Sequence, residues 1–191
     1  VEKIKTLFPT SSAANGYGLT ETSAASSQNA GLEYIAKPES CGPAIPVCDV
    51  KVVDEKGNTL PTGEVGELWI FGPNVVKEYW NKPEATAETF TDGWLHSGDL
   101  ASIDEEGFIY ILDRAKDMLI RGGENVYCVE VEDALYSHDD VMDAAVIGIP
   151  HKVLGEEVGA VIQVTPGSSV TEGDLQTYVR QHLAAFKVPV K

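Results

Sequence analysis

The sequence predicts a mixed α/β protein of the α+β kind, with an antiparallel, β-rich region followed by a smaller domain that has helices on one face of a short sheet. Two observations support this prediction. Short apolar runs separated by Gly and Pro fill residues 40–112, as in antiparallel sheets. Residues 118–191 instead alternate strand-like and helix-like runs in the order β, α, β, β, α.

The composition is that of a folded globular chain. Of its 191 residues, 43% are hydrophobic and 23% are charged, and no apolar run is long enough to span a membrane. The formal net charge of −16 argues against a nucleic-acid partner or an anionic-membrane surface, since both need a basic face.

Three cysteines form neither a CxxC pair nor an even set, which indicates reduced thiols that act as small buried apolar residues. We therefore expect a cytoplasmic protein. A peroxisomal or other organellar location stays open, because a targeting segment could precede Val1.

Several elements are expected before residue 112. Val1–Leu7 has the spacing of an amphipathic helix stopped by Pro9. The runs "VCDVKVVD" and "ELWIFG" indicate strands, and a helix should begin at Pro83 and continue to Phe90. "DLASIDEEGFIYILD" is typical of a hairpin that turns at Asp104–Gly107.

The residue composition changes at "DRAKD", residues 113–117. This segment has the composition of an exposed connector between domains or, equally, of a charged hairpin end. A small hairpin around Gly122 and Gly123 and a helix over 129–137 follow, and then the strands "DAAVIGIPH" and "VGAVIQVTPG". A last helix should start at a capping box formed by Thr171 and Asp174. Its expected apolar side consists of Leu175, Val179, Leu183 and Phe186.

The stretch "NGYGLTET", residues 15–22, combines groups that a nucleotide with its metal would use. Glycines allow close backbone approach, and the ring of Tyr17 can cover a planar base. Thr20 can bond a phosphate oxygen, and Glu21 is a hard oxygen ligand suited to Mg²⁺. A plain turn is the alternative interpretation of this stretch.

A second candidate is Asp99, at the end of "GWLHSGD" and at the mouth of the predicted hairpin. A carboxylate at such a position can accept hydrogen bonds from two vicinal ribose hydroxyls. Alternatively, it is a turn aspartate that bonds its own backbone. His96 is interpreted as structural.

Taken together, four stretches resemble in order and spacing the later motifs of the adenylate-forming superfamily, which holds acyl- and aryl-CoA synthetases, luciferases and peptide-synthetase adenylation domains. The stretches are "NGYGLTET", "GELWIFGPNVVKEYW", "GWLHSGDLASIDEEGFIYILDRAKDMLIRGGENVYCVEVE" and "VIGIPHKVLGEEVGAVI". The resemblance implies a distorted β-barrel joined by a hinge to a small α+β domain.

The resemblance also implies a role for single residues in the first half of the chain. Asn15 and Gly16 match the positions that edge the adenine, and Tyr17 matches the ring stacked on it. Thr20 matches the α-phosphate contact and Glu21 the magnesium ligand. The remaining nucleotide-binding positions are Gly18, Asp99 at the ribose, and Arg114 at the ribose or phosphate.

In the second half, Lys116 matches the hinge about which the small domain rotates between the two half-reactions. Gly122 and Gly123 match the passage of the CoA pantetheine, and Asn125 matches an amide near the acyl-adenylate. The catalytic group implied by the family is then Thr20, Glu21 and Asn125.

Departures from the family pattern bear on activity. No Gly/Ser/Thr-rich phosphate loop precedes Asn15, and the chain stops at "FKVPVK", before the motif that holds the family's catalytic lysine. Glu78 and Cys128 stand where the family usually has glycine and proline. We expect a C-terminal portion of a larger enzyme that needs the missing N-terminal region and forms no acyl-adenylate alone.

The expected organisation is a remnant of the large domain over 1–37, a β-rich subdomain over 38–112, the hinge over 113–117 and the small domain over 118–191. The expected function is that of an acyl-CoA ligase that uses ATP, Mg²⁺ and CoA on a carboxylic acid, most simply a fatty acid. An adenylation domain that loads a carrier protein, a luciferase-like oxygenase and a non-catalytic adenosine-binding module are the alternatives.

Overall fold

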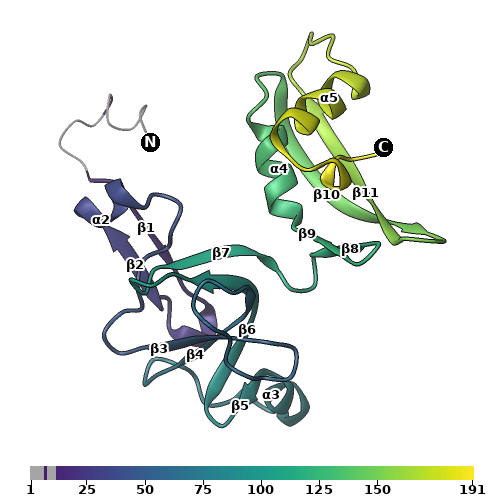
Figure 1. The fold of residues 1–191 in the computed structure, drawn as a ribbon. Coiled ribbons are helices and arrows are strands. Elements are labelled where there is room, and N and C mark those ends of the chain that lie inside the picture. Colours follow the sequence, from purple (N-terminus) through teal and green to yellow (C-terminus); the bar gives the residue numbers. More distant parts are fainter. Residues whose placement is uncertain (1–6, 8–11) are drawn as a thin grey trace. The chain divides into compact units, whose positions relative to one another are not determined.

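The computed structural model describes residue 7 and residues 12–191, so the helix predicted for Val1–Leu7 lies outside the described residues apart from Leu7. The chain divides into two compact units, Val1–Ile111 and Leu112–Lys191, which are described separately (Figure 1). Within the described residues, no helix has both the length and the apolar character needed to cross a membrane.

The first unit is built on a five-stranded antiparallel sheet in the order β3-β4-β6-β5, with β7 paired to β6. Its strands are β3 (Asp49–Val53), β4 (Gly66–Phe71), β5 (Phe90–Thr91), β6 (Trp94–Ile103) and β7 (Ile109–Arg114). The strand order over the described residues is open, so the antiparallel prediction is confirmed while the implied barrel does not close.

A second, two-stranded sheet pairs β1 (Ala14–Tyr17) with β2 (Ser27–Ala30). The short helix η1 (Thr20–Thr22) lies between them, and α2 (Gly31–Ala36) and α3 (Pro83–Thr89) complete the first unit. Isolated bridges Ser27–Ala44 and Gly42–Ile109 connect this small sheet to the rest of the unit. The stretch "NGYGLTET" therefore begins on β1, which is connected to the rest of the unit through its pairing with β2.

The core of the first unit lies under β4 and β6. Leu68, Ile70 and Leu95 are at most 1% exposed and pack with Val52 and Ile109, because alternate strand residues face the same side. This apolar layer fixes the strands that carry the candidate site.

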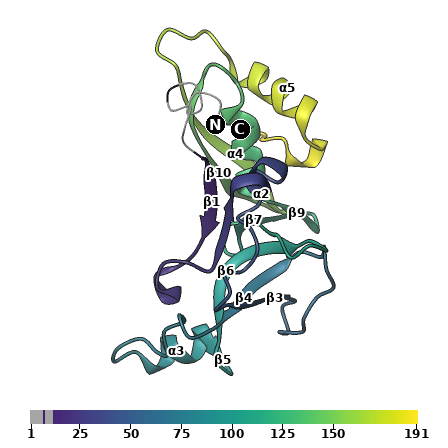
Figure 2. The same ribbon diagram turned by 90° about the vertical axis from the view of Figure 1, so that its left-hand side faces the viewer.

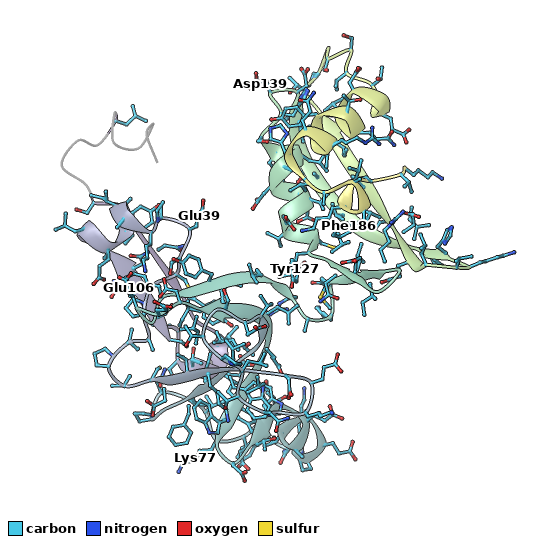
Figure 3. The ribbon with its side chains drawn as sticks, in the orientation of Figure 1. Glu39, Lys77, Glu106, Tyr127, Asp139 and Phe186 are labelled. Carbon is cyan, nitrogen blue, oxygen red and sulfur yellow. The ribbon has the colours of Figure 1, made fainter. Side chains whose placement is uncertain are left out.

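The turn between β6 and β7 falls where the sequence predicts it. Oδ1 of Asp104 accepts hydrogen bonds from the Glu106 and Phe108 amides at 2.9 Å each, and Gly107 adopts a φ of 85°. Lys37 forms ion pairs with Asp104 at 2.6 Å and with Glu106, labelled in Figure 3, at 3.0 Å. The turn is thereby tied to the segment after α2.

The second unit is a four-stranded sheet in the order β10-β11-β8-β9, with two helices on one face (Figure 2). Its elements are β8 (Leu119–Arg121), β9 (Glu124–Val126), α4 (Cys128–Tyr136), β10 (Val141–His151), β11 (Gly155–Val164), α5 (Glu172–His182) and η2 (Ala185–Lys187). Val131 and Val179 from the helices and Val158 from β11 are fully buried together. The predicted order of elements is confirmed.

Helix α5 begins as the capping box predicts, because Oγ1 of Thr171 accepts the Asp174 amide and the Asp174 carboxylate accepts the Thr171 amide at 3.0 Å. It ends at His182, however, so the predicted continuation through Phe186 is wrong. Leu183 and Phe186 still pack on the core. The chain turns there because the Val190 amide bonds the Val158 carbonyl at 2.8 Å, a ladder contact that a continuing helix could not reach.

The segment "DRAKD" is only partly the exposed connector that its composition predicts. Residues 114–117 are exposed, but Asp113 is only 4% exposed. Its carboxylate accepts hydrogen bonds from the Arg114 amide at 2.7 Å and from the Cys128 amide, the first residue of α4, at 2.5 Å. A carboxylate at a helix N-terminus is stabilised there, so Asp113 belongs to the packing of the second unit.

All three cysteines are buried, as predicted for small apolar residues. Burial, with Asp113 and other acidic groups nearby, raises the pKa of the Cys128 thiol to about 12. The Cys128 thiol donates a hydrogen bond to the Asp117 carbonyl at 3.0 Å and stays protonated at neutral pH.

Candidate nucleotide-binding site

The residues predicted to surround the adenine line one pocket of the first unit, with a volume of about 620 Å³. It is lined by Ala14, Asn15, Gly16, Tyr17, Gly18, Ala24, Ala25, Ser27, Gln28 and Ile45. β1 supplies one wall and β2 with the Ala24–Ala25 turn supplies another. The pocket is large enough for a nucleoside.

Tyr17 and Asp99, which are 82 positions apart in the sequence, meet at the end of β1 and in the middle of β6. The Tyr17 hydroxyl donates to Oδ2 of Asp99 at 2.5 Å. Burial and this hydrogen bond to an acidic neighbour raise the pKa of Tyr17 well above its usual value, so the hydroxyl stays a donor at neutral pH. An aromatic ring and a carboxylate are thus held side by side.

Asp99 does not lie at a hairpin mouth, as the sequence suggested, but inside β6, where the strand bulges. The pairing with β4 shifts from Glu67 opposite Leu100 to Trp69 opposite His96. Three residues of β6 (Ser97, Gly98 and Asp99) therefore face only Leu68. The bulge turns the Asp99 carboxylate toward β1.

Glu67 stabilises this bulge, and sequence reasoning missed it. Oε1 of Glu67 accepts the Gly98 amide at 3.0 Å, and Oε2 accepts the Trp69 indole at 2.9 Å. Gly98 has a φ of 73°, a conformation that favours glycine. His96 stacks on Trp69 at 3.9 Å between ring centroids, in keeping with its structural interpretation.

The structure gives Gly18 a different reason for being glycine from the close ligand approach considered above. A Cβ at this position would lie 1.9 Å from the Ala24 carbonyl oxygen. Such a distance is far inside van der Waals contact, so only glycine at position 18 allows its backbone to lie this close to the backbone of Ala24. Gly18 shapes the pocket by packing of the backbone.

Thr20 and Glu21 lie on η1 directly after this crossing, and neighbouring segments hold the turn in place. The Val76 amide donates to the Glu21 carbonyl at 2.8 Å. The Asn74 side-chain amide donates to the Thr22 and Ala25 carbonyls at 3.1 and 3.0 Å, and the Ser23 hydroxyl donates to the Asn74 carbonyl at 2.9 Å. Residues 74–76 therefore fix the turn, a role that the sequence did not reveal.

The described residues contain no group of three or more His, Cys, Asp or Glu side chains that could hold a metal by themselves. The carboxylate that the sequence proposes as a metal ligand is that of Glu21. This fits Mg²⁺ bound to a nucleotide, because that ion typically takes one or two protein carboxylates and completes its shell with phosphate oxygens and water.

The other predicted site residues belong to the second unit. Arg114 and Lys116 are exposed around the turn after β7, and Asn125 is exposed on β9. Gly122 and Gly123 form the β8–β9 turn with φ values of 62° and 92°, and glycine favours both positive values. Hairpin geometry alone therefore requires these two glycines.

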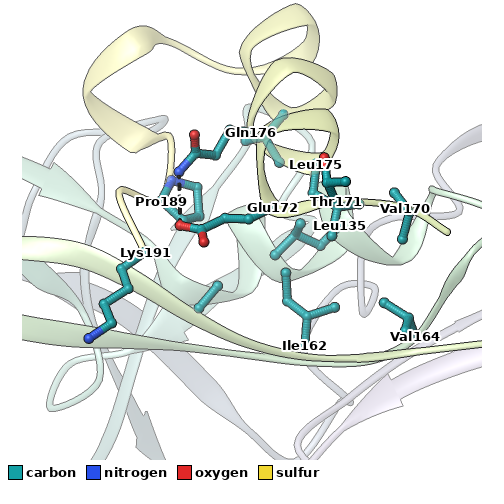
Figure 4. Close-up of a pocket in the computed structure, with 12 residues that line it drawn as sticks. Leu135, Ile162, Val164, Val170, Thr171, Glu172, Leu175, Gln176, Pro189 and Lys191 are labelled. Carbon is teal, nitrogen blue, oxygen red and sulfur yellow. Dashed lines mark hydrogen bonds between the residues drawn. The ribbon is translucent and has the colours of Figure 1, made fainter.

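The second unit also has a pocket of its own, with a volume of about 250 Å³, between α5, β11 and the last residues (Figure 4). Leu135, Ile162, Val164, Val170, Leu175 and Val179 make most of its lining apolar. Glu172 and Gln176 lie at one side and share a hydrogen bond of 3.4 Å. None of the predicted site residues lines it.

Comparison with protein families assigns the class. The AMP-binding enzyme model matches residues 1–80, and the AMP-binding enzyme C-terminal domain model matches residues 130–191. The chain therefore belongs to the adenylate-forming, AMP-binding enzyme family, as the motifs had indicated.

The relatives include a feruloyl-CoA synthase and a long-chain-fatty-acid–CoA ligase. The chain is 42% identical over 91% of its length to a feruloyl-CoA synthase from an Amycolatopsis species, and covers 35% of that protein. It is also 42% identical over 91% of its length to a long-chain-fatty-acid–CoA ligase from Bacillus subtilis, and covers 31% of it. The chain thus spans about a third of the length of the curated relatives it matches.

Solved structures agree with the fold. The o-succinylbenzoate CoA synthetase from Bacillus subtilis, in complex with an acyl-adenylate intermediate, matches all of the chain with a TM-score of 0.91 and 36% identity, over 38% of that structure. The same enzyme in complex with ATP and magnesium matches 94% of the chain with a TM-score of 0.88 and 37% identity, over 37% of its own length.

Proposed function

We propose that the protein is an ATP-dependent acyl-CoA ligase. It would join a carboxylic acid to the α-phosphate of ATP with release of pyrophosphate, and the CoA thiol would then displace AMP to give the thioester. The observation that carries this proposal is the contact between Tyr17 and Asp99 beside the pocket of the first unit. These are the two groups that an adenosine needs, one for its base and one for its ribose.

In this proposal the Tyr17 ring covers the adenine, and the backbone at Asn15, Gly16 and Gly18 borders it. Asp99 accepts hydrogen bonds from the ribose hydroxyls, which a buried carboxylate does more strongly than a neutral group. Thr20, exposed at the start of η1, bonds the α-phosphate.

Glu21 is the proposed magnesium ligand. When bound, Mg²⁺ would neutralise phosphate charge during nucleotide binding and transfer. The turn that carries Glu21 is already fixed by the Asn74 and Val76 contacts, so little ordering would remain when the ion binds.

The second unit would supply the groups for the second half-reaction. We propose Lys116 as the hinge of rotation and Arg114 as a contact to ribose or phosphate. Gly122 and Gly123 would border the pantetheine passage, and Asn125 would lie near the acyl-adenylate. Exposure of Arg114, Lys116 and Asn125 supports these roles, because each must reach a ligand. The proposed divisions stay at 1–37, 38–112, 113–117 and 118–191.

A fatty acid is the proposed substrate, and an aryl acid is the comparison. We also propose that the 191 residues alone do not form an acyl-adenylate, since they span only about a third of the relatives' length. Both points are tested by pyrophosphate release with ATP, Mg²⁺ and a panel of fatty and aryl acids, the first on the protein expressed from its complete gene and the second on the 191 residues. Turnover by the 191 residues above the blank would contradict the second point.

Measurements of thioester formation and oxygen consumption on the protein expressed from its complete gene distinguish the enzyme alternatives. Saturation of thioester formation by free CoA supports the ligase. A requirement for a carrier protein would support an adenylation domain instead, and oxygen consumption would support a luciferase-like reaction.

The nucleotide site itself is tested by calorimetric titration of the 191-residue chain with AMP. We expect Asp99→Asn to weaken AMP binding by about 10-fold or more, because a hydrogen bond to a charged group contributes roughly 1.5–3 kcal/mol. Asp54→Asn is the matched control, since Asp54 caps a turn that asparagine also supports. Equal affinities of the two variants would contradict the assignment of Asp99, and a chain that binds no AMP would contradict the site.

A further inference from the structure

Tyr79 makes a contact with the metal-site candidate that the motifs do not indicate. Its hydroxyl donates to Oε1 of Glu21 at 2.6 Å, across 58 positions of sequence. Glu21 lies on η1, and Tyr79 lies in the loop that leads to α3. Among the described residues, this is the side-chain hydrogen bond that fixes the Glu21 carboxylate.

Tyr79 is itself held from two other directions. Its amide donates to Oγ1 of Thr86 at 3.0 Å, and that hydroxyl in turn donates to the Lys82 carbonyl at 2.8 Å. Its ring lies against the Phe90 ring with 5.8 Å between centroids. Helix α3 and β5 thus set the position of the phenol before any ligand binds.

The chemistry of the pair suits an ionised carboxylate. The Tyr79 phenol is a neutral hydrogen-bond donor. A neutral donor leaves the carboxylate its negative charge, whereas a lysine at this place would compete with a cation. The bond engages Oε1, and so restricts the directions that Oε2 can take.

We propose that Tyr79 is a positioning residue that orients the Glu21 carboxylate toward nucleotide-bound Mg²⁺. The inference rests on the proposed function, because it takes Glu21 as the metal ligand. Partners that orient a metal ligand usually change metal affinity by about 10- to 100-fold when removed. A role in packing alone would change stability and leave metal affinity as it was.

The test uses the protein expressed from its complete gene, with ATP present and Mn²⁺ as the probe, followed by electron paramagnetic resonance. Tyr79→Phe removes one oxygen and keeps the ring on Phe90. Tyr136→Phe is the matched control, because its hydroxyl donates to Asp143 at 2.5 Å in the second unit. We expect Tyr79→Phe to weaken Mn²⁺ binding about 10-fold, with kcat at saturating metal nearly unchanged and Tyr136→Phe without effect.

A double-mutant cycle tests whether Tyr79 acts on metal affinity through Glu21. Glu21→Asp keeps the charge and withdraws the carboxylate from Tyr79 by one methylene, so adding Tyr79→Phe to it should change Mn²⁺ affinity no further. Additive losses would overturn the inference, as would wild-type Mn²⁺ affinity in Tyr79→Phe.

Glu21→Gln distinguishes a failure of the metal-ligand assignment of Glu21 from a failure of the positioning role of Tyr79. Loss of Mn²⁺ binding in Glu21→Gln with wild-type binding in Tyr79→Phe would leave the metal ligand in place and overturn only the role of Tyr79. Wild-type binding in Glu21→Gln would instead overturn the metal assignment, and the role of Tyr79 with it.

Discussion

The two units hold their candidate residues in opposite ways. In the first unit, side chains from distant segments bond one another, as Tyr17 does with Asp99 and Tyr79 with Glu21. In the second, the candidates lie within one short stretch from Arg114 to Asn125, and Arg114, Lys116, Gly122, Gly123 and Asn125 are exposed. For Gly122 and Gly123, the backbone of a turn with φ values of 62° and 92° sets the position.

This difference indicates two kinds of ligand contact. A network of side chains fixed by the fold is preorganised, so binding spends little free energy on ordering it. Exposed groups on a hairpin and a turn suit contacts that are made and released, as a hinged small domain requires. Under the proposed function, the first unit would hold the ligand and the second would present groups to it.

Tryptophan provides a direct way to follow the units separately. The three tryptophans of the chain, Trp69, Trp80 and Trp94, all lie in the first unit. Their fluorescence therefore reports the unfolding of that unit, while far-ultraviolet circular dichroism reports both. Each substitution below should change the unfolding of one unit and leave the unfolding of the other unit unchanged.

The largest effect is expected from Gly18→Val in the first unit. The new side chain would meet the Ala24 backbone, and overpacking against backbone that cannot move should lower the free energy of unfolding by about 3 kcal/mol or more. Urea titration followed by tryptophan fluorescence measures this loss. Gly173→Ala, at an open helical position in the second unit, is the control and should be neutral or slightly stabilising. A fluorescence midpoint equal to wild type in Gly18→Val would show that the crossing at Ala24 is not tight.

A smaller effect is expected from Cys128→Pro in the second unit. Proline has no amide hydrogen, so the buried Asp113 carboxylate would lose one of its donors. We expect a loss of about 2 kcal/mol relative to Cys128→Ala, which keeps the amide. Circular dichroism during urea unfolding measures it, with the fluorescence transition unchanged. Equal midpoints for the two variants would mean that the Asp113 contact adds nothing to stability.

The smallest effect is expected from Thr171→Ala at the start of α5. Removal of the capping hydroxyl should cost the second unit about 1 kcal/mol. Thr177→Ala, in the middle of the same helix, removes a hydroxyl bonded only to the Gly173 carbonyl and is the control. If both variants unfold alike by circular dichroism, the capping box does not stabilise this helix.

The sequence predicted the elements well where local chemistry decides them. Pro83 begins α3, Asp104 and Gly107 make the β6–β7 turn, and Thr171 caps α5. The errors occur where tertiary contacts prevail. Pairing of Val190 with β11 ends α5 before Leu183, and the contact with α4 buries Asp113 within a charged segment.

For the site, sequence reasoning found residues whose chemistry stands out and missed those that act through others. Tyr17 and Asp99 were each proposed for a ligand, but nothing in their spacing showed that they bond each other. Glu67 and Tyr79 lie in the quoted stretch "GELWIFGPNVVKEYW", but the motif gives them no role, because their roles arise from a β-bulge and a loop that only the fold brings near. Such partners appear only when the strand register is known.

The shared hydrogen bond between Tyr17 and Asp99 has a consequence for selectivity. Under the proposed function, one of the two residues meets the base and the other meets the sugar. A change of base that displaces the ring would then also displace the carboxylate through the bond that joins them. Base and sugar are in that case recognised cooperatively, so the penalty for a missing ribose hydroxyl depends on which base is attached to it.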